Sequence, residues 1–390
     1  MQLPQYIVCF SHLRWDFVYQ RPQHLMSRFA KHSVVYYFEE PVFTDDVPST
    51  LSISQRADNL WLCVPHLVHG LTPKEVNIEI KNLLDVLLEN KAPEDLLFWY
   101  YTPMALKFSN TFNPGCVVYD CMDELSAFKF APPELRALET KLFDIADVVF
   151  TGGHSLFESK RNEHTNIHPF PSSIDKLHFQ SARAGNQEPS DQAAISGFKV
   201  GFYGVLDERF DIKLIAEMAA ARPEWQIILI GPIVKINPDT LPKHANIHYL
   251  GPKGYDELPL YLSGWDVALI PFVLNESTFF ISPTKTPEYL AGGKPVVSTA
   301  IKDVIYEYGK NDAVNIGTDS SEFIDIIDNL KASKPDAEWL AKVDLVLARN
   351  SWDHTFSEMQ LLILKSISNR TLLLTPNRLM DEKDEYLNQN

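Results

Sequence analysis

The sequence predicts an α/β protein made of two consecutive doubly wound domains. Short apolar runs of β-type composition alternate with amphipathic helical segments in both halves of the 390-residue chain. Such alternation is typical of parallel sheets covered by helices on both faces. A small, polar, aperiodic stretch at residues 181–196 separates the two series, and the length suits two domains at about 150 residues each. We therefore expect domains at residues 1–180 and 197–350, joined by a linker.

The first half begins with a buried strand and a loop rich in polar and aromatic residues. The strand is predicted at residues 6–10 and the loop at residues 11–16. Pro22 is tolerated in the first turn of the next helix, where a backbone N–H would lack a partner anyway. Further strands are predicted at residues 34–38, 60–64, 96–101, 117–119 and 148–151, and helices at 21–31 and 77–88.

The second half repeats the pattern, and several of its strands end in glycine turns. Strands are predicted at residues 199–204, 226–231, 246–250, 267–271 and 295–298, and helices at 212–221, 258–264, 288–291 and 321–331. A terminal helix at about residues 353–367 could belong to either half; we assign segment 351–370 to it and expect it to pack back on the first domain. The polar residues 371–390 are expected to form a flexible tail.

Composition excludes several classes of function. The net charge of −16 and the pI of about 5.2 argue against nucleic-acid binding, which needs a basic surface, and against general electrostatic binding to anionic membranes. The N-terminus has no signal-peptide pattern, and no apolar run is long enough to span a membrane. Four cysteines without a Cys-x-x-Cys pair indicate buried, reduced thiols. We expect a cytoplasmic protein with no integral membrane segment and at most transient contact with the inner membrane face.

The most informative stretch is residues 281–299, which contains a loop, a short helix, a glycine stop and a buried strand. Pro287 must lie in the first helical turn, so the helix starts between Pro283 and Thr286, with Thr284 or Thr286 as its N-cap. Lys285 and Glu288 then share one face near the helix start. Free N–H groups and the positive dipole end suit phosphate, and a neighbouring carboxylate suits a ribose diol. This pattern predicts a nucleoside-diphosphate site, although Glu288 could instead complement the helix dipole and Lys285 could be solvated.

Other candidates lie in turns after predicted strands, where ligands of doubly wound sheets bind. Gly204 and Gly231 would let the backbone approach a phosphate. Arg209 could bind phosphate in a bidentate manner or pair with a neighbouring aspartate. Gly251 and Tyr255 could contact a base, or form a plain turn with a core tyrosine.

The candidates of the first half follow its first strand and the strand that ends at Tyr119. An aromatic ring flanked by hydrogen-bonding groups suits a sugar, whereas a solvated loop is the simpler alternative. Asp120 and Asp123 could orient hydroxyls or accept a proton, or could act as helix caps. His164 and His168 are helically spaced, but Pro169 and Pro171 break a helix there, so a metal pair is not expected. The candidates of the loop are His12, Arg14, Trp15, Asp16, Gln20 and Arg21.

These motifs together resemble a GT-B-fold glycosyltransferase with two facing Rossmann-like domains, similar to the family 4 (group 1) enzymes of bacterial surface-polysaccharide synthesis. The resemblance covers most of the chain and is most specific at residues 282–290 (SPTKTPEYL) and 293–297 (GKPVV). Weaker support comes from residues 20–25 (QRPQHL), 119–124 (YDCMDE), 150–153 (FTGG), 202–209 (FYGVLDER), 230–232, 246–251, 258–262 and 266–271.

The resemblance implies a nucleotide-sugar donor in the second domain, retention of anomeric configuration and no bound metal. Glu288 would hold the ribose, the backbone of residues 282–285 the pyrophosphate, and the turn at Gly251 the base. Three features depart from the family pattern. Phe280 stands where an acid is common, Val205 and Asp211 stand where basic residues are common, and residues 101–103 replace a histidine-containing loop. Arg209 and Lys285 could supply the missing positive charge.

The sequence thus predicts transfer of a sugar from a nucleoside-diphosphate sugar, UDP rather than GDP, to a glycan or lipid-linked glycan, with no cofactor. The alternatives are a UDP-sugar epimerase of the same fold and a degenerate transferase that scaffolds polysaccharide assembly. We assign the catalytic role to Asp120, Asp123 and His12, and the acceptor role to Trp15, Arg21 and Asp16. The donor role is assigned to Glu288, Lys285, Arg209, Gly204, Gly231, Gly251, Tyr255, Ser282, Pro283 and Thr284.

Overall fold

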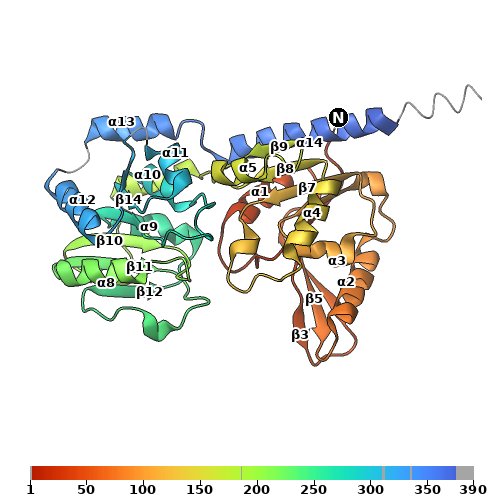
Figure 1. Ribbon diagram of the computed structural model, residues 1–390, viewed down its shortest axis with the longest axis horizontal. Helices are drawn as coiled ribbons and strands as arrows, with labels where there is room; N and C mark the ends of the chain where they lie inside the picture. The colour runs from red at the N-terminus through yellow and green to blue at the C-terminus, as the bar shows by residue number, and fades with distance from the viewer. Residues whose placement is uncertain (1, 186, 310–311, 334–335, 375–390) are drawn as a thin grey trace, which may run out of the picture.

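The computed structural model describes residues 2–185, 187–309, 312–333 and 336–374 and shows two α/β halves, each built on its own sheet (Figure 1). The first sheet has the order β3-β5-β2-β1-β6-β7-β8-β9, with β4 paired to β5, and the second has the order β12-β11-β10-β13-β14-β15. All pairs are parallel except β4–β5. The predicted fold class is therefore confirmed.

The first sheet has helices on both faces because its strands are apolar on both sides. One face packs under α2, α3 and α4, and the other under α1 and the terminal helix α14. The strands are β1 (Tyr6–Ser11), β2 (Val34–Glu39), β3 (Val42–Thr44), β4 (Thr50–Ala57), β5 (Leu60–Val68), β6 (Leu96–Tyr100), β7 (Cys116–Cys121), β8 (Val148–Thr151) and β9 (Ile167–Pro169). The helices are α1 (Arg21–Phe29), α2 (Pro73–Leu88), α3 (Leu106–Ser109), α4 (Leu135–Ile145) and α5 (His154–Lys160).

The second sheet is built in the same way around one continuous apolar core. Its strands are β10 (Phe198–Tyr203), β11 (Trp225–Ile230), β12 (Ile247–Gly251), β13 (Val267–Ile270), β14 (Val296–Ser298) and β15 (Val314–Ile316). Its helices are α8 (Ile212–Ala221), α9 (Leu258–Ser263), α10 (Lys285–Ala291), α11 (Lys302–Glu307), α12 (Ser320–Ala332) and α13 (Ala337–Val346).

The antiparallel pair β4–β5 was not predicted, nor were β3, β9 and β15. Strand β4 has the sequence TLSISQRA and is exposed along most of its length, so no buried face imposed an apolar pattern that the sequence could reveal. In Figure 1 this part of the sheet extends away from the body of the first domain.

The chain passes between the halves twice, and neither passage is a free linker. Before the second sheet begins, α6 (Lys176–Gln180) and α7 (Ser190–Ala193) frame the segment expected as a linker. Ile174 and Phe179 already belong to the second core. Gln192 is fully buried; its Nε2 donates to the Tyr261 carbonyl at 2.8 Å, and its Oε1 accepts from Trp265 Nε1 at 2.9 Å.

The terminal helix α14 (Trp352–Leu374) returns to the first domain and packs beside α1, β7 and β8 (Figure 1). Trp352 stacks on His24, with ring centroids 4.6 Å apart and planes 13° apart, and its N–H donates to the carbonyl of Ile174. Met359 and Ile363 are fully buried in the same cluster. The predicted tail overlaps this helix at residues 371–374, and residues 375–390 lie outside the described chain.

The four cysteines are buried and unpaired, as predicted. Among the residues that the structure describes, no helix combines the length and apolar character needed to cross a membrane.

Replacing Trp352 with Ala should lower the free energy of unfolding by about 3–5 kcal/mol, because a large ring that is 1% exposed would leave a cavity between α14 and α1. Urea unfolding followed by circular dichroism measures this loss. Leu361→Ala is the matched control, since Leu361 lies on the same helix but is 61% exposed. Equal losses in the two variants would show that α14 is not anchored through Trp352.

Candidate active site

A cavity of about 520 Å³ lies between the two domains and is lined from both. Its size is within the usual range of small-molecule sites. The turns after β10 and β11 supply one wall, and the loop after β1 with the turn after β7 supplies the other. Carboxyl ends of parallel strands therefore face each other across it, which is where doubly wound sheets bind ligands.

Helix α10 presents its N-terminal turn to this cavity. It begins at Lys285 with Thr284 as the N-cap, within the predicted window, and Pro287 lies in its first turn. Thr284 makes no side-chain capping bond. Ser282, Pro283, Thr284, Lys285 and Glu288 all line the cavity, and their role in binding a donor stays a prediction.

Lys285 extends from α10 across the turn after β10. Its Nζ lies 5.8 Å from the ring centroids of both Phe202 and Phe272. Of the lysines and arginines that line the cavity within the described chain, Lys285 alone has no carboxylate within ion-pair distance. Burial lowers the pKa of Lys285, and the nearby Glu288 opposes that shift. The side chain is thus a partly buried cation whose charge is available to an anion.

Gly204 and Gly231 make room for this lysine. Gly204 has φ of +143°, and a Cβ there would lie 2.1 Å from Lys285 Cε. Gly231 has φ of +141°, and a Cβ there would lie 1.9 Å from the Gly204 carbonyl oxygen. Both glycines line the cavity, and a side chain at either would displace the lysine or the turn beneath it.

Glu288 is 7% exposed and is oriented by a tyrosine that we did not predict. Tyr203 Oη donates to Glu288 Oε2 at 2.8 Å. Tyr203 is held in turn by Tyr289, whose Oη accepts the Tyr203 N–H at 2.9 Å. Burial raises the pKa of Glu288 to about 7. The position of Tyr203 directly before the Gly204 turn could have indicated a site residue. We interpreted its strand only as part of the core.

Arg209 lines the cavity but its charge is neutralised. Its guanidinium forms a fork with Asp207, with the shortest contact at 2.6 Å from Nη2 to Oδ2. It also lies 5.3 Å from the ring of Phe128, a residue of the first domain. The alternative interpretation, pairing with a neighbouring aspartate, is the arrangement that the structure shows.

Tyr255 lines the cavity, with one aromatic ring stacked on its own and a second one tilted against it. His178 lies 4.6 Å away at 13° and Tyr19 lies 4.6 Å away at 31°. Its buried hydroxyl has no hydrogen-bond partner among the residues that the structure describes. Gly251 has φ of +70° and shapes the turn, but the cavity wall is formed by residues 252–255 after it.

Asp120, near the end of β7, and Asp123, just after this strand, have different surroundings. Asp120 is fully buried and accepts hydrogen bonds from Arg21 at 2.8–3.1 Å. Arg21 also donates to the carbonyl of Phe170 at 2.8 Å. Asp120 is absent from the cavity wall, whereas Asp123 lines it. The structure thus places Asp120 in a supporting ion pair and leaves only Asp123 in reach of a ligand.

Asp123 is the carboxylate best placed for chemistry on the first-domain side. Burial raises its pKa to about 6, while the charges of Arg209 and Arg21 oppose that shift. His12 does not line the cavity, and its buried Nδ1 has no partner. Burial and the charge of Lys235 lower the pKa of His12 to about 4, so its imidazole is neutral near pH 7.

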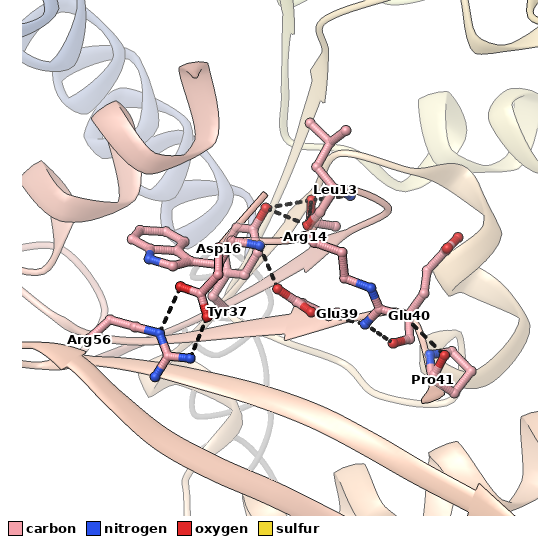
Figure 2. Close-up of polar contacts among 10 residues, drawn as sticks. Leu13, Arg14, Asp16, Tyr37, Glu39, Glu40, Pro41 and Arg56 are labelled. Atoms are coloured by element: carbon pink, nitrogen blue, oxygen red, sulfur yellow. Dashed lines mark hydrogen bonds and ion pairs between the residues drawn. The ribbon is translucent and has the colours of Figure 1, made fainter. Parts of the chain in front are cut away.

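The loop after β1 places Trp15, Asp16, Gln20 and Arg21 at the cavity. Trp15 packs edge-on against Tyr37 at 4.9 Å. Asp16 pairs with Arg56 at 2.6 Å (Figure 2). In the described part of the chain, no group of three or more His, Cys, Asp or Glu side chains could hold a metal ion.

No family model matches this chain. The TuaH protein of Bacillus subtilis (strain 168), named as a glycosyltransferase of teichuronic acid biosynthesis, is 24% identical over 261 residues. The match covers 60% of this chain and 65% of that relative, so the chain spans less than two thirds of its length.

Solved structures match nearly the whole chain. Sucrose-phosphate synthase from Thermosynechococcus elongatus superposes with a TM-score of 0.69 at 14% identity, covering 94% of this chain and 100% of that one. A UDP-forming α,α-trehalose-phosphate synthase from Burkholderia xenovorans gives 0.67 at 12%, covering 94% and 99%. Anabaena HepE in complex with UDP and glucose gives 0.63 at 13%, covering 91% and 98%. The chain has the GT-B fold.

Two features distinguish this GT-B chain from the family pattern. Phe280, at the position where an acid is common, packs against the core of the first domain and edge-on against Phe279 at 4.9 Å. The turn after β10 lacks a basic side chain until Arg209, which is neutralised. The free positive charge beside this turn comes instead from Lys285 on α10.

Glu288→Gln should change the pH dependence of stability. The unfolded chain ionises this group near pH 4.3, whereas the folded protein holds the proton up to about pH 7. Between these values the folded state binds more protons, so wild-type stability falls as the pH rises. The variant cannot ionise, so its free energy of unfolding relative to wild type should be about 3 kcal/mol higher at about pH 8 than at about pH 4.5.

Urea unfolding at the two pH values measures this difference. Glu338→Gln is the control, because that side chain is 78% exposed in α13 and should show no such dependence. A relative stability of Glu288→Gln that is the same at both pH values would contradict the raised pKa.

Proposed function

We propose that this chain is a glycosyltransferase that moves a sugar from a nucleoside-diphosphate sugar, with UDP favoured, to a glycan or lipid-linked glycan. The observation that carries the proposal is the juxtaposition of an unpaired lysine, the start of α10 and a tyrosine-held glutamate in one interdomain cavity. The fold agrees, and the names of TuaH and of the UDP-bound HepE support both the activity and the nucleotide.

The diphosphate would lie between Lys285 and the N–H groups at the start of α10. Its negative charge grows as the bond to the sugar breaks, and a positive group already in place stabilises that change without reorganisation. We propose that Lys285 and the helix start supply this charge without a metal ion. The glycines at 204 and 231 allow the phosphates to approach the backbone.

The ribose would be held by Glu288. Tyr203 occupies Oε2, which leaves Oε1 for the ribose hydroxyls. An ionised carboxylate accepts two hydroxyl hydrogen bonds better than a protonated one. Binding of a diphosphate to Lys285 and of the ribose to Glu288 would therefore depend on the protonation of both groups, which are only three residues apart.

Asp123 would face the acceptor from the other wall. Its carboxylate accepts no hydrogen bond that the structure records, and it lies near Arg209 and Lys285. We propose that it orients the acceptor hydroxyl and takes its proton as that oxygen bonds to the donor carbon. The bond from this carbon to the diphosphate oxygen breaks in the same step, and UDP leaves. Retention of anomeric configuration, expected from the family resemblance, is part of this proposal.

Lys285→Met should weaken UDP binding at least about 10-fold, because a buried charge-assisted contact to phosphate is lost. UMP, which lacks the second phosphate, should lose less affinity than UDP. Isothermal titration with both nucleotides measures the two changes. Lys213→Met, at a side chain that is 84% exposed on α8, should bind both like wild type. Unchanged UDP affinity in Lys285→Met would remove the lysine from the donor site.

Asp123→Asn should separate binding from chemistry. UDP affinity should stay within about two-fold of wild type, while turnover should fall by about 100-fold or more, as for loss of a hydroxyl-activating carboxylate. Wild-type turnover should also decline as the pH falls below about 6, where Asp123 is protonated, and the variant should lack this decline. UDP release across a panel of UDP-sugars measures both effects, with Asp144→Asn, at an exposed position of α4, as the control.

The same panel distinguishes the two alternatives. Conversion of a UDP-sugar to its epimer without an acceptor would favour the epimerase. A protein that binds UDP but releases no UDP from any UDP-sugar would favour a scaffolding role. Phe280, which stands where an acid is common, is the observation that suggests this role.

A further inference from the structure

The arginines around the first-domain wall of the cavity are all neutralised. Arg21, 3% exposed at its side chain, lines the cavity, but its guanidinium is taken by Asp120, whose side chain is fully buried. Its Nη1 donates to the carbonyl of Phe170 at 2.8 Å. Replacing a buried, doubly hydrogen-bonded carboxylate by a ligand phosphate would leave Asp120 unpaired, which is strongly unfavourable.

The arginines in and beside the loop after β1 are also paired with carboxylates (Figure 2). Arg14 donates to Glu39 Oε2 at 2.9 Å and to the carbonyls of Glu40 at 2.6 Å and Pro41 at 3.2 Å. Glu39 also accepts the N–H of Trp15 at 2.6 Å, so one buried carboxylate fixes both the arginine and the loop. Arg56 donates through two nitrogens to both oxygens of Asp16.

The charges that remain on this wall are negative. Asp123 has no ion-pair partner among the described residues, and Asp16 is 62% exposed despite its contact with Arg56. The available cation of the cavity, Lys285, belongs to the opposite wall, where the proposed diphosphate would neutralise it. A second phosphate arriving at the first-domain wall would meet repulsion and find no free donor cation.

Aromatic rings occupy the same wall. Trp15, Phe17 and Tyr19 all line the cavity, and Phe17 and Tyr19 are 54% and 41% exposed. Exposed rings beside carboxylates suit the C–H face and the hydroxyl groups of an uncharged pyranose. Such rings offer large contact areas at a low cost in conformational entropy.

We infer, on the basis of the proposed transferase function, that the acceptor presents an uncharged sugar to this wall and that sugar phosphates are rejected. This chain would therefore differ from an enzyme of the same fold that takes a phosphorylated acceptor. The selectivity arises chiefly from the pairing of Arg21, the first-domain arginine that lines the cavity, with Asp120. Arg14 and Arg56 lie beside the wall rather than in it, and they are paired with Glu39 and with Asp16, of which Asp16 lines the cavity.

The test compares neutral hexosides with the corresponding hexose 6-phosphates on UDP-saturated protein, so that phosphate cannot occupy the donor site. Saturation-transfer NMR at low salt gives their relative binding, and UDP release from UDP-sugars gives their relative use as acceptors. For wild type, neutral forms should bind and react at least about 10-fold better than phosphates. Preference for the phosphates, or binding of neither form at any soluble concentration, would overturn the inference.

A charge variant makes the test independent of the choice of sugar. Asp16→Asn frees Arg56 beside the cavity and should improve hexose 6-phosphate binding by a few fold at low salt, with less gain at high salt. Asp85→Asn makes the same change of net charge in the Lys81–Asp85 pair on α2, away from the cavity, and should have no effect. Equal responses of the two variants would contradict the inference.

This outcome can be separated from failure of the proposed function. If wild type does not bind UDP, the transferase proposal itself fails. If UDP binds and responds to Lys285→Met but phosphorylated sugars are preferred, only the inference on the acceptor is wrong.

Discussion

The site depends on one constraint: the ammonium of Lys285 is partly buried without a carboxylate to neutralise it. Taking a cation out of water is costly unless an opposite charge meets it. Here the lysine lines the cavity, and a Cβ at Gly204 in the turn beneath it would collide with its side chain. The fold therefore holds an unpaired charge. A bound diphosphate would compensate this charge and so remove the free-energy cost of burying it. This unpaired lysine therefore supports the proposal that the cavity binds an anion.

Charge is distributed unequally over the two walls. The second domain keeps a free cation and a glutamate whose burial holds its pKa near 7. The first domain pairs each arginine of its wall with a carboxylate and leaves Asp123 unpaired. A donor with a diphosphate and an acceptor with hydroxyl groups match this difference. The loop after β1 is fixed by Glu39 and Tyr37 as well as by hydrogen bonds within the loop (Figure 2), so this wall of the cavity is in place before a ligand arrives.

Sequence patterns predicted the parts of the fold that depend on local chemistry. Apolar runs located most strands, and Pro287 limited the start of α10 to a few positions, as the structure confirms. Strand β4 was missed because an exposed strand needs no apolar alternation. Asp120 and Asp123 follow the same strand and could not be distinguished, since the partner of Asp120 is an arginine 99 residues away. Tyr203 was missed for the same reason: its hydrogen bond to Glu288 is a product of tertiary packing.

A crystal structure of the protein with UDP tests the central claim most directly. The account predicts the β-phosphate within hydrogen-bond distance of Lys285 Nζ and of N–H groups at the start of α10, with the ribose hydroxyls at Glu288. Because the cation stands unpaired across Gly204, little side-chain movement should accompany binding. A nucleotide bound elsewhere in the cavity, or one whose phosphates contact Arg21 in place of Lys285, would contradict the account.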